Sequence, residues 1–169
     1  VSQCSDDAWR QKMNNEMQTE ALLYDNLELE IRSAGGDSER QIADIRHFIE
    51  QGVDLLIVAP NEAIPVTPVV EEAYARGIPV IVVDRKILSD HYTAYIGADN
   101  YRIGKIIGEY VASQLGGRGE VIELTGLSGS TPAIDRHQGF VNALKNHPGI
   151  RVLCSEDAHW LRSDAEVRA

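Results

Sequence analysis

Cysteine is scarce in this 169-residue chain, which contains only Cys4 and Cys154, near opposite ends of the sequence. Neither has a second cysteine or a histidine at the spacing of a metal-binding motif. The five histidines include no pair at the i, i+4 spacing that would place both on one helix face. We therefore expect no bound metal ion.

Basic residues and long apolar runs are also in short supply. Lys and Arg number 16 against 26 Asp and Glu, which gives a formal net charge of −10. Such a chain lacks the basic surface that binds phosphate backbones, so direct nucleic-acid binding is not expected. The longest apolar runs, 55–60 and 78–83, are far shorter than the ~18 residues of a membrane-spanning helix. With 43% hydrophobic and 25% charged residues, the composition is that of a globular domain.

Motifs for nucleotide binding and nucleophilic catalysis are missing as well. The chain has neither G-x-G-x-x-G after its first strand nor G-x-x-x-x-G-K-[ST]. Ser128 lacks the G-x-S-x-G frame of a hydrolase nucleophile. Its loop, 126–130, could hold an anion at a helix N-terminus, although a strand–helix connection capped by Ser130 or Thr131 is the plainer interpretation. Because no nucleophile, metal set or acid–base pair stands out, we expect neither enzymatic activity nor a cofactor.

What is present is an alternation of strand and helix patterns. Period-two alternation predicts an edge strand at 27–31, and apolar runs predict strands buried on both faces at 53–59 and 78–83. Shorter strands are expected at 94–97, 120–124 and 150–153. Helices are expected where apolar residues recur every three or four positions, beginning near Trp9, at Ser38 with Gln41 as a capping box, at Thr67-Pro68, at Asn100 and at Ser130 or Thr131. Repeated strand–helix units predict an α/β fold with doubly wound, mostly parallel sheets.

Ligands of such sheets bind outside the carboxyl ends of the strands, and polar side chains occur there. Asp84 and Arg85 directly follow the run 78–83, where a carboxylate beside a guanidinium can bind a hydroxyl-rich ligand. A surface ion pair at a strand end explains them equally well. Asp6 and Trp9 lie where the first strand meets the first helix. The indole can anchor a core or present its flat face to the apolar side of a sugar ring.

Two further candidates occur in the second half of the chain. Arg136 lies in the first turns of the helix after Pro132, where an isolated arginine would more often be solvated. Trp160 lies among polar residues after the strand at 150–153 and has no evident core to join. Together the candidates suit recognition of a small neutral polyol rather than bond cleavage: Asp6, Trp9, Asp84, Arg85, Arg136 and Trp160.

The chain resembles periplasmic sugar-binding proteins of the ribose-binding type, the type 1 periplasmic-binding-protein family. The resemblance is carried, in order, by VSQCSDDAW, VDLLIVAPNE, GIPVIVVDRKI, YIGADNYRIGK and ELTGLSGSTPAIDRHQGF. VVDRKILSDHYTAYIGADN and TGLSGSTPAIDRHQGF are closer still to periplasmic sensor domains of hybrid two-component systems that detect monosaccharides. The resemblance implies a periplasmic location and two lobes, an N-terminal lobe at 1–98 and the truncated start of a second at 99–169.

The resemblance also implies roles for the candidate residues. Asp84 and Arg85 correspond to the clamp on the sugar hydroxyls, and Arg136 to the arginine of the second lobe. Trp9 and Trp160 correspond to the aromatic residues that stack on the sugar ring. Asp6 corresponds to the polar residue of the first loop, where the family often has Asn, and we expect its carboxylate to affect the sugar preference.

The function implied is binding of a pentose or hexose, such as fructose, in an interlobe cleft of a sensor domain. A sugar-binding protein of an ABC transporter and the effector domain of a LacI-type regulator are the alternatives, and a Rossmann-like enzyme is the weakest. The expected partners are a small neutral monosaccharide, the rest of the second lobe and downstream signalling or transport modules. A linked histidine kinase, a membrane contact through segments outside the chain and a homodimer are compatible with these expectations.

Overall fold

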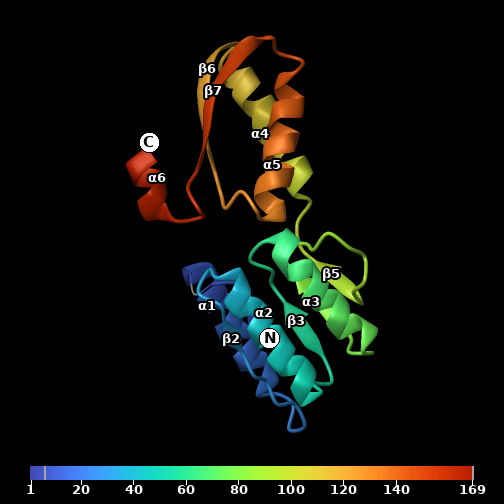
Figure 1. Ribbon diagram of the computed structural model, residues 1–169. Helices are drawn as coiled ribbons and strands as arrows, with labels where there is room; N and C mark the ends of the chain where they lie inside the picture. The colour runs from blue at the N-terminus through green and yellow to red at the C-terminus, as the bar shows by residue number, and fades with distance from the viewer. Residues whose placement is uncertain (6, 169) are drawn as a thin grey trace. The chain divides into compact units, whose positions relative to one another are not determined.

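The structure, a computed structural model, describes residues 1–5 and 7–168 (Figure 1). The chain folds as two compact units, Val1–Gly97 and Ala98–Ala169. Each unit alternates strands with helices. Among the described residues, no helix combines the length and the apolar character that crossing a bilayer requires.

The first unit is built on a five-stranded sheet in which all neighbouring strands are parallel. The strands follow the order β2-β1-β3-β4-β5, so the chain leaves β1 first toward one edge and then toward the other. This doubly wound order confirms the predicted fold class and places a topological switch point between β1 and β3. The strands are β1 Ser2–Gln3, β2 Arg32–Ser33, β3 Leu56–Val58, β4 Val80–Val83 and β5 Ala94–Ile96; the helices are α1 Ala8–Ala21, α2 Ser38–Gln51 and α3 Ala63–Ala75.

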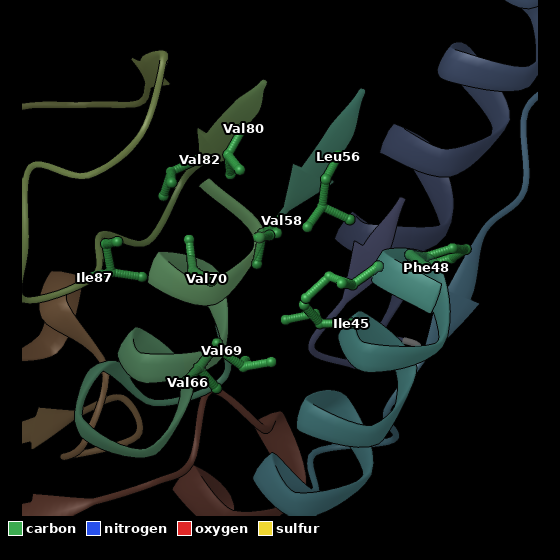
Figure 2. Close-up of a cluster of buried hydrophobic side chains, with 12 residues drawn as sticks. Ile45, Phe48, Leu56, Val58, Val66, Val69, Val70, Val80, Val82 and Ile87 are labelled. Atoms are coloured by element: carbon green, nitrogen blue, oxygen red, sulfur yellow. The ribbon is translucent and has the colours of Figure 1, made fainter. Parts of the chain in front are cut away.

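The core of the first unit lies between the sheet and the helices α2 and α3. Figure 2 shows side chains from β3 and β4, including Val58 and Val82, converging with Ile45 of α2 and Val66 of α3. All four are 0% exposed. Right-handed crossovers place α2 and α3 on one face of the sheet and α1 on the other.

The face of the sheet on the α1 side is less well covered than the sequence predicts. The runs 53–59 and 78–83 were expected to be buried on both faces. Ile57 and Ile81 point to the face opposite Val58 and Val82, and both are only partly buried. The two-sided burial is therefore incomplete.

The second unit consists of a two-stranded parallel sheet and three helices. The strands are β6 Arg118–Thr125 and β7 Gly149–Asp157; the helices are α4 Asn100–Gln114, α5 Thr131–Leu144 and α6 Arg162–Arg168. Helices α4 and α5 lie side by side and pack closely (Figure 1). Small residues permit this approach: a Cβ added at Gly104 would lie 2.0 Å from the carbonyl oxygen of Arg136, and one added at Gly139 would lie 2.1 Å from that of Tyr101.

The predicted edge strand at 27–31 is wrong. Strand β2 contains only Arg32 and Ser33, and its ladder begins where the Arg32 N–H donates to the Val1 carbonyl at 2.9 Å. Leu27 is 53% exposed, so the alternating pattern has no apolar layer to face. Period-two alternation predicts a strand only where a partner strand and a buried face are both available.

The start of the third helix was also misplaced. Helix α3 begins at Ala63, which leaves Thr67 and Pro68 inside it. Pro68 has no N–H to donate to the Ile64 carbonyl, and the preceding Thr67 hydroxyl donates to the Ala63 carbonyl at 2.6 Å.

Helix α2 begins where predicted, but its cap is Asp37. The Asp37 carboxylate accepts from the backbone N–H groups of Glu39 and Arg40 at 2.9 and 3.2 Å. Ser38 and Gln41, predicted as a capping box, instead bond to the loop after β3. The helix ends at Gly52, which has a left-handed conformation with φ 70°. Ser130 is the N-cap residue of α5, also as predicted.

Candidate ligand-binding site

The site in the first unit is centred on Asp84, directly after β4. Its carboxylate accepts a hydrogen bond from Arg10 Nη2 at 2.5 Å and lies 4.0 Å from Arg85 Nε. The Asp84 side chain is 31% exposed, whereas the side chains of Arg10 and Arg85 are almost completely buried. Asp84 therefore presents one carboxylate to solvent on a support of two buried guanidinium groups.

Arg10 is the site residue that the sequence did not reveal. It is 2% exposed, although it lies on α1 beside Trp9, which is 58% exposed. Among the side chains of residues 1–5 and 7–168, the buried polar atoms without a partner are Ser2 Oγ, Gln3 Oε1 and Arg10 Nη1. A buried charge with an unused donor is unfavourable, which makes Arg10 Nη1 a candidate donor to a ligand.

Arg85 is held by the loop that follows β3. Its Nη1 donates to the Asn61 carbonyl at 2.7 Å. The Asn61 side chain in turn donates to the carbonyl of Gly36 and to the hydroxyl of Ser38. Burial of the guanidinium lowers the pKa of Arg85, and the nearby charge of Arg10 lowers it further. Because an arginine pKa is so high, Arg85 remains a cation with a fixed orientation.

Trp9 is not a core residue, which removes one of its two interpretations. Its indole is mostly exposed, and the Arg10 guanidinium lies 4.7 Å from the ring centroid. Asp7 caps α1 by accepting from the N–H groups of Trp9 and Arg10, both at 3.0 Å. Partial burial alone would raise the pKa of Asp7, but hydrogen bonds from Ser5 and from this helix N-terminus lower it. The cap fixes the first turn that carries both Trp9 and Arg10.

In the second unit, the structure brings Arg136 and Trp160 together. The Arg136 guanidinium lies 5.4 Å from the indole centroid, and its Nε donates to Asn100 Oδ1 at 2.8 Å. Trp160 Nε1 donates to the Ser130 hydroxyl at 3.2 Å, and the side chain is 39% exposed. Trp160 adopts a positive φ of 66°, uncommon for a bulky residue, so these contacts hold a strained turn in place.

Gly126 leaves the space that the Trp160 ring occupies. A Cβ at this position would lie 2.0 Å from the indole, so Gly126→Ala should displace the ring from Ser130 and Arg136. If Trp160 stacks on a sugar, affinity should fall about fivefold to tenfold, the value of one aromatic contact. Calorimetry would measure the change, with Val167→Ala, at a residue 87% exposed on α6, as the control. Equal affinities for the two variants would contradict a stacking role for Trp160.

The predicted site residues thus fall into two groups, one in each unit. Trp9, Asp84 and Arg85 gather with Arg10 at the carboxyl ends of β1 and β4. Arg136 and Trp160 meet beside the loops after β6 and β7. Asp6 lies outside the described residues. These residues remain the predicted ligand contacts, and the structure shows that Arg10 pairs with Asp84, Asn61 with Arg85 and Asn100 with Arg136.

The fold and the site define an α/β ligand-binding domain, with charged and aromatic side chains at the carboxyl ends of parallel strands. Comparison with known families is more specific: the periplasmic binding protein domain matches residues 1–169. The chain belongs to this family, and the resemblance seen in the sequence is confirmed.

Individual relatives of known function cover most of the chain. It is 36% identical over 163 residues to the galactofuranose-binding protein of Escherichia coli (strain K12), an overlap of 94% of this chain and 51% of that protein. It is 32% identical to the ribose import binding protein of Bacillus subtilis (strain 168), over 79% of this chain and 43% of the relative. The chain spans about half the length of the curated relatives that it matches.

A solved structure gives a stronger match. The fructose-binding periplasmic domain of a hybrid two-component system superposes with a TM-score of 0.94 at 59% identity, covering 98% of this chain and 55% of that one. A galactofuranose-binding protein superposes with a TM-score of 0.87 at 34% identity, covering 98% and 57%. The fold class predicted from the sequence is therefore also that of these relatives.

Proposed function

We propose that this chain forms part of a periplasmic sensor domain that binds a monosaccharide without chemically changing it. The observation that carries the proposal is the cluster of Arg10, Asp84 and Arg85 beside the exposed indole of Trp9. Similarity to binding proteins and to a sensor domain supports a binding role rather than an enzymatic one.

The cluster has the chemistry that a neutral sugar requires. Each sugar hydroxyl can donate one hydrogen bond and accept others, so Asp84 accepts while Arg10 and Arg85 donate. Trp9 offers an apolar face to the C–H side of the ring. A charge-assisted hydrogen bond contributes ~1.5–3 kcal/mol and an aromatic contact ~0.5–1.5 kcal/mol. Micromolar binding requires ~8 kcal/mol, so several such contacts must form together. In the second unit, Arg136 and Trp160 offer a guanidinium and an indole of the same chemistry, and we propose them as further sugar contacts.

The sugar class that we favour is a ketohexose or a monosaccharide in its five-membered ring form, with fructose first. The 59% identical structure is that of a fructose-binding periplasmic domain. Of the proteins 31–34% identical, one is a galactofuranose-binding protein and two have structures in complex with fucofuranose and with arabinofuranose.

Fructose should raise the midpoint of thermal unfolding in the native protein that contains this chain. At 100 times its dissociation constant, a ligand stabilises the folded state by about 2.7 kcal/mol, which is several degrees in a domain of this size. A differential scanning fluorimetry panel of fructose, ribose, arabinose, galactose and myo-inositol would rank the sugars. No shift with any of them would contradict the proposal.

Transport is the second candidate function, because ribose import binding proteins are among the relatives. A sensor transmits a signal only if the sugar favours one of its conformations over another. Deleting the gene distinguishes the two roles: a sensor's loss abolishes the transcriptional response to the sugar and spares uptake, whereas a carrier's loss abolishes uptake.

A further inference from the structure

The backbone of Asp84 has a left-handed conformation, with φ 62°. Residues other than glycine seldom adopt this conformation, and it persists only where neighbouring groups hold it. Both peptide groups of Asp84 are held by β5: the Asp84 N–H donates to the Ile96 carbonyl at 2.8 Å, and the Tyr95 hydroxyl donates to the Asp84 carbonyl at 2.8 Å.

The Tyr95 side chain is itself held from several sides. It packs, partly buried, against the core of the first unit. The Lys86 ammonium lies 5.0 Å from the ring centroid. Gly97 leaves room for the hydroxyl, because a Cβ there would lie only 2.0 Å from it. Lys86 and Gly97 therefore border the Tyr95 side chain, whose hydroxyl bonds the carbonyl of Asp84.

We propose that Tyr95 is a positioning residue for the Asp84 carboxylate. Its hydroxyl holds the Asp84 peptide in the left-handed turn that points the side chain at Arg10 and at the ligand. The Arg85 N–H also closes this turn by donating to the Val83 carbonyl at 2.7 Å, so losing the Tyr95 bond loosens the peptide and leaves the carboxylate less well aligned with Arg10. The inference rests on the proposed sugar-binding function and extends it to a residue that need not touch the sugar.

Tyr95→Phe removes only the hydroxyl and keeps the ring in the core. We expect fructose, measured by calorimetry in the native protein, to bind about threefold to tenfold more weakly, the value of one hydrogen bond. Tyr92→Phe is the matched control, because Tyr92 also packs partly buried against this core. It should change the affinity less than twofold. Wild-type affinity in Tyr95→Phe would overturn the proposal.

A double-mutant cycle separates positioning from a structural role. With Asp84→Ala as the background there is no carboxylate to orient, so adding Tyr95→Phe should weaken binding no further. Titrations followed by NMR at millimolar sugar would measure both affinities. An equal loss in the two backgrounds would overturn the proposal, because it would mean that Tyr95 acts on general stability.

Gly97→Ala supplies a second route if Tyr95→Phe folds poorly. The new methyl group must displace the Tyr95 hydroxyl from Asp84, and we expect the same threefold to tenfold loss. Unchanged affinity in this variant would overturn the proposal. If the unsubstituted protein binds no sugar in the panel, the proposed function fails and this inference fails with it. If the unsubstituted protein binds a sugar and the Tyr95 and Gly97 variants bind it with the same affinity, only the role of Tyr95 is refuted.

Discussion

Asp84→Ala should weaken sugar binding about a hundredfold, the largest loss that we expect from a single substitution in the first unit. The substitution removes the exposed acceptor for the sugar hydroxyls, and charge-assisted bonds contribute ~1.5–3 kcal/mol each. It also removes the partner of Arg10 Nη2, whose guanidinium is 2% exposed and already has one unpaired donor at Nη1. The buried cation would then be free to reorient away from the ligand.

Calorimetry on the native protein measures this loss, and circular dichroism shows whether the fold is retained. Asp90→Ala is the matched control, since its carboxylate is 98% exposed on the same segment after β4. The sugar affinity of Asp84→Asn should lie between those of Asp84→Ala and Asp90→Ala, because an amide keeps one acceptor but loses the charge that pairs with Arg10. An Asp84→Ala protein that binds fructose as well as the control would remove the basis of the proposed site.

Gly104→Ala should destabilise the second unit, although the same exchange inside an ordinary helix stabilises it by about 1 kcal/mol. The new methyl group would lie 2.0 Å from the carbonyl oxygen of Arg136, and a backbone atom cannot move aside as a flexible side chain can. Helices α4 and α5 would have to separate, a form of overpacking that costs roughly 1–3 kcal/mol. The prediction is easy to check, because the expected change in stability is opposite in sign to that of a Gly→Ala exchange in an ordinary helix.

Thermal or urea unfolding of the native protein measures the change. Gly139→Ala should behave alike, because its methyl group would lie 2.1 Å from the Tyr101 carbonyl. Ser113→Ala, on an exposed position of α4, is the control and should be neutral or stabilising. Since Gly104 supports the backbone of Arg136, sugar affinity should fall in Gly104→Ala as well. A stabilised Gly104→Ala protein would show that the two helices do not pack this closely.

The sequence predicted the α/β class, and it predicted that several candidate residues follow the carboxyl ends of strands, because both depend on local patterns. Buried strands have distinctive apolar runs, and the residues that follow them, such as Asp84 and Arg85, must lie at the carboxyl edge of a parallel sheet. Trp160 was identified by the absence of an apolar neighbourhood. These inferences need only the order of strands and helices, which can be read from the sequence.

The failures have a different physical origin. Arg10 was missed because on the first helix only Trp9 stood out, for which a core position and an exposed position were both left open, and an arginine next to it gives no local sign of burial. The strand at 27–31 was predicted from alternation alone, although a strand also needs a partner. The role of Tyr95 depends on a contact between β5 and the end of β4, which no local pattern reveals.

The left-handed backbone at Asp84 also restricts how this family of sites can evolve. Aspartate, asparagine and glycine tolerate that conformation far better than other residues, so few single exchanges at position 84 preserve the turn. Trp9, on an exposed helical turn, is under no such restriction. Relatives that bind new sugars are therefore expected to differ at Trp9, whereas Asp84 is expected to change little among them.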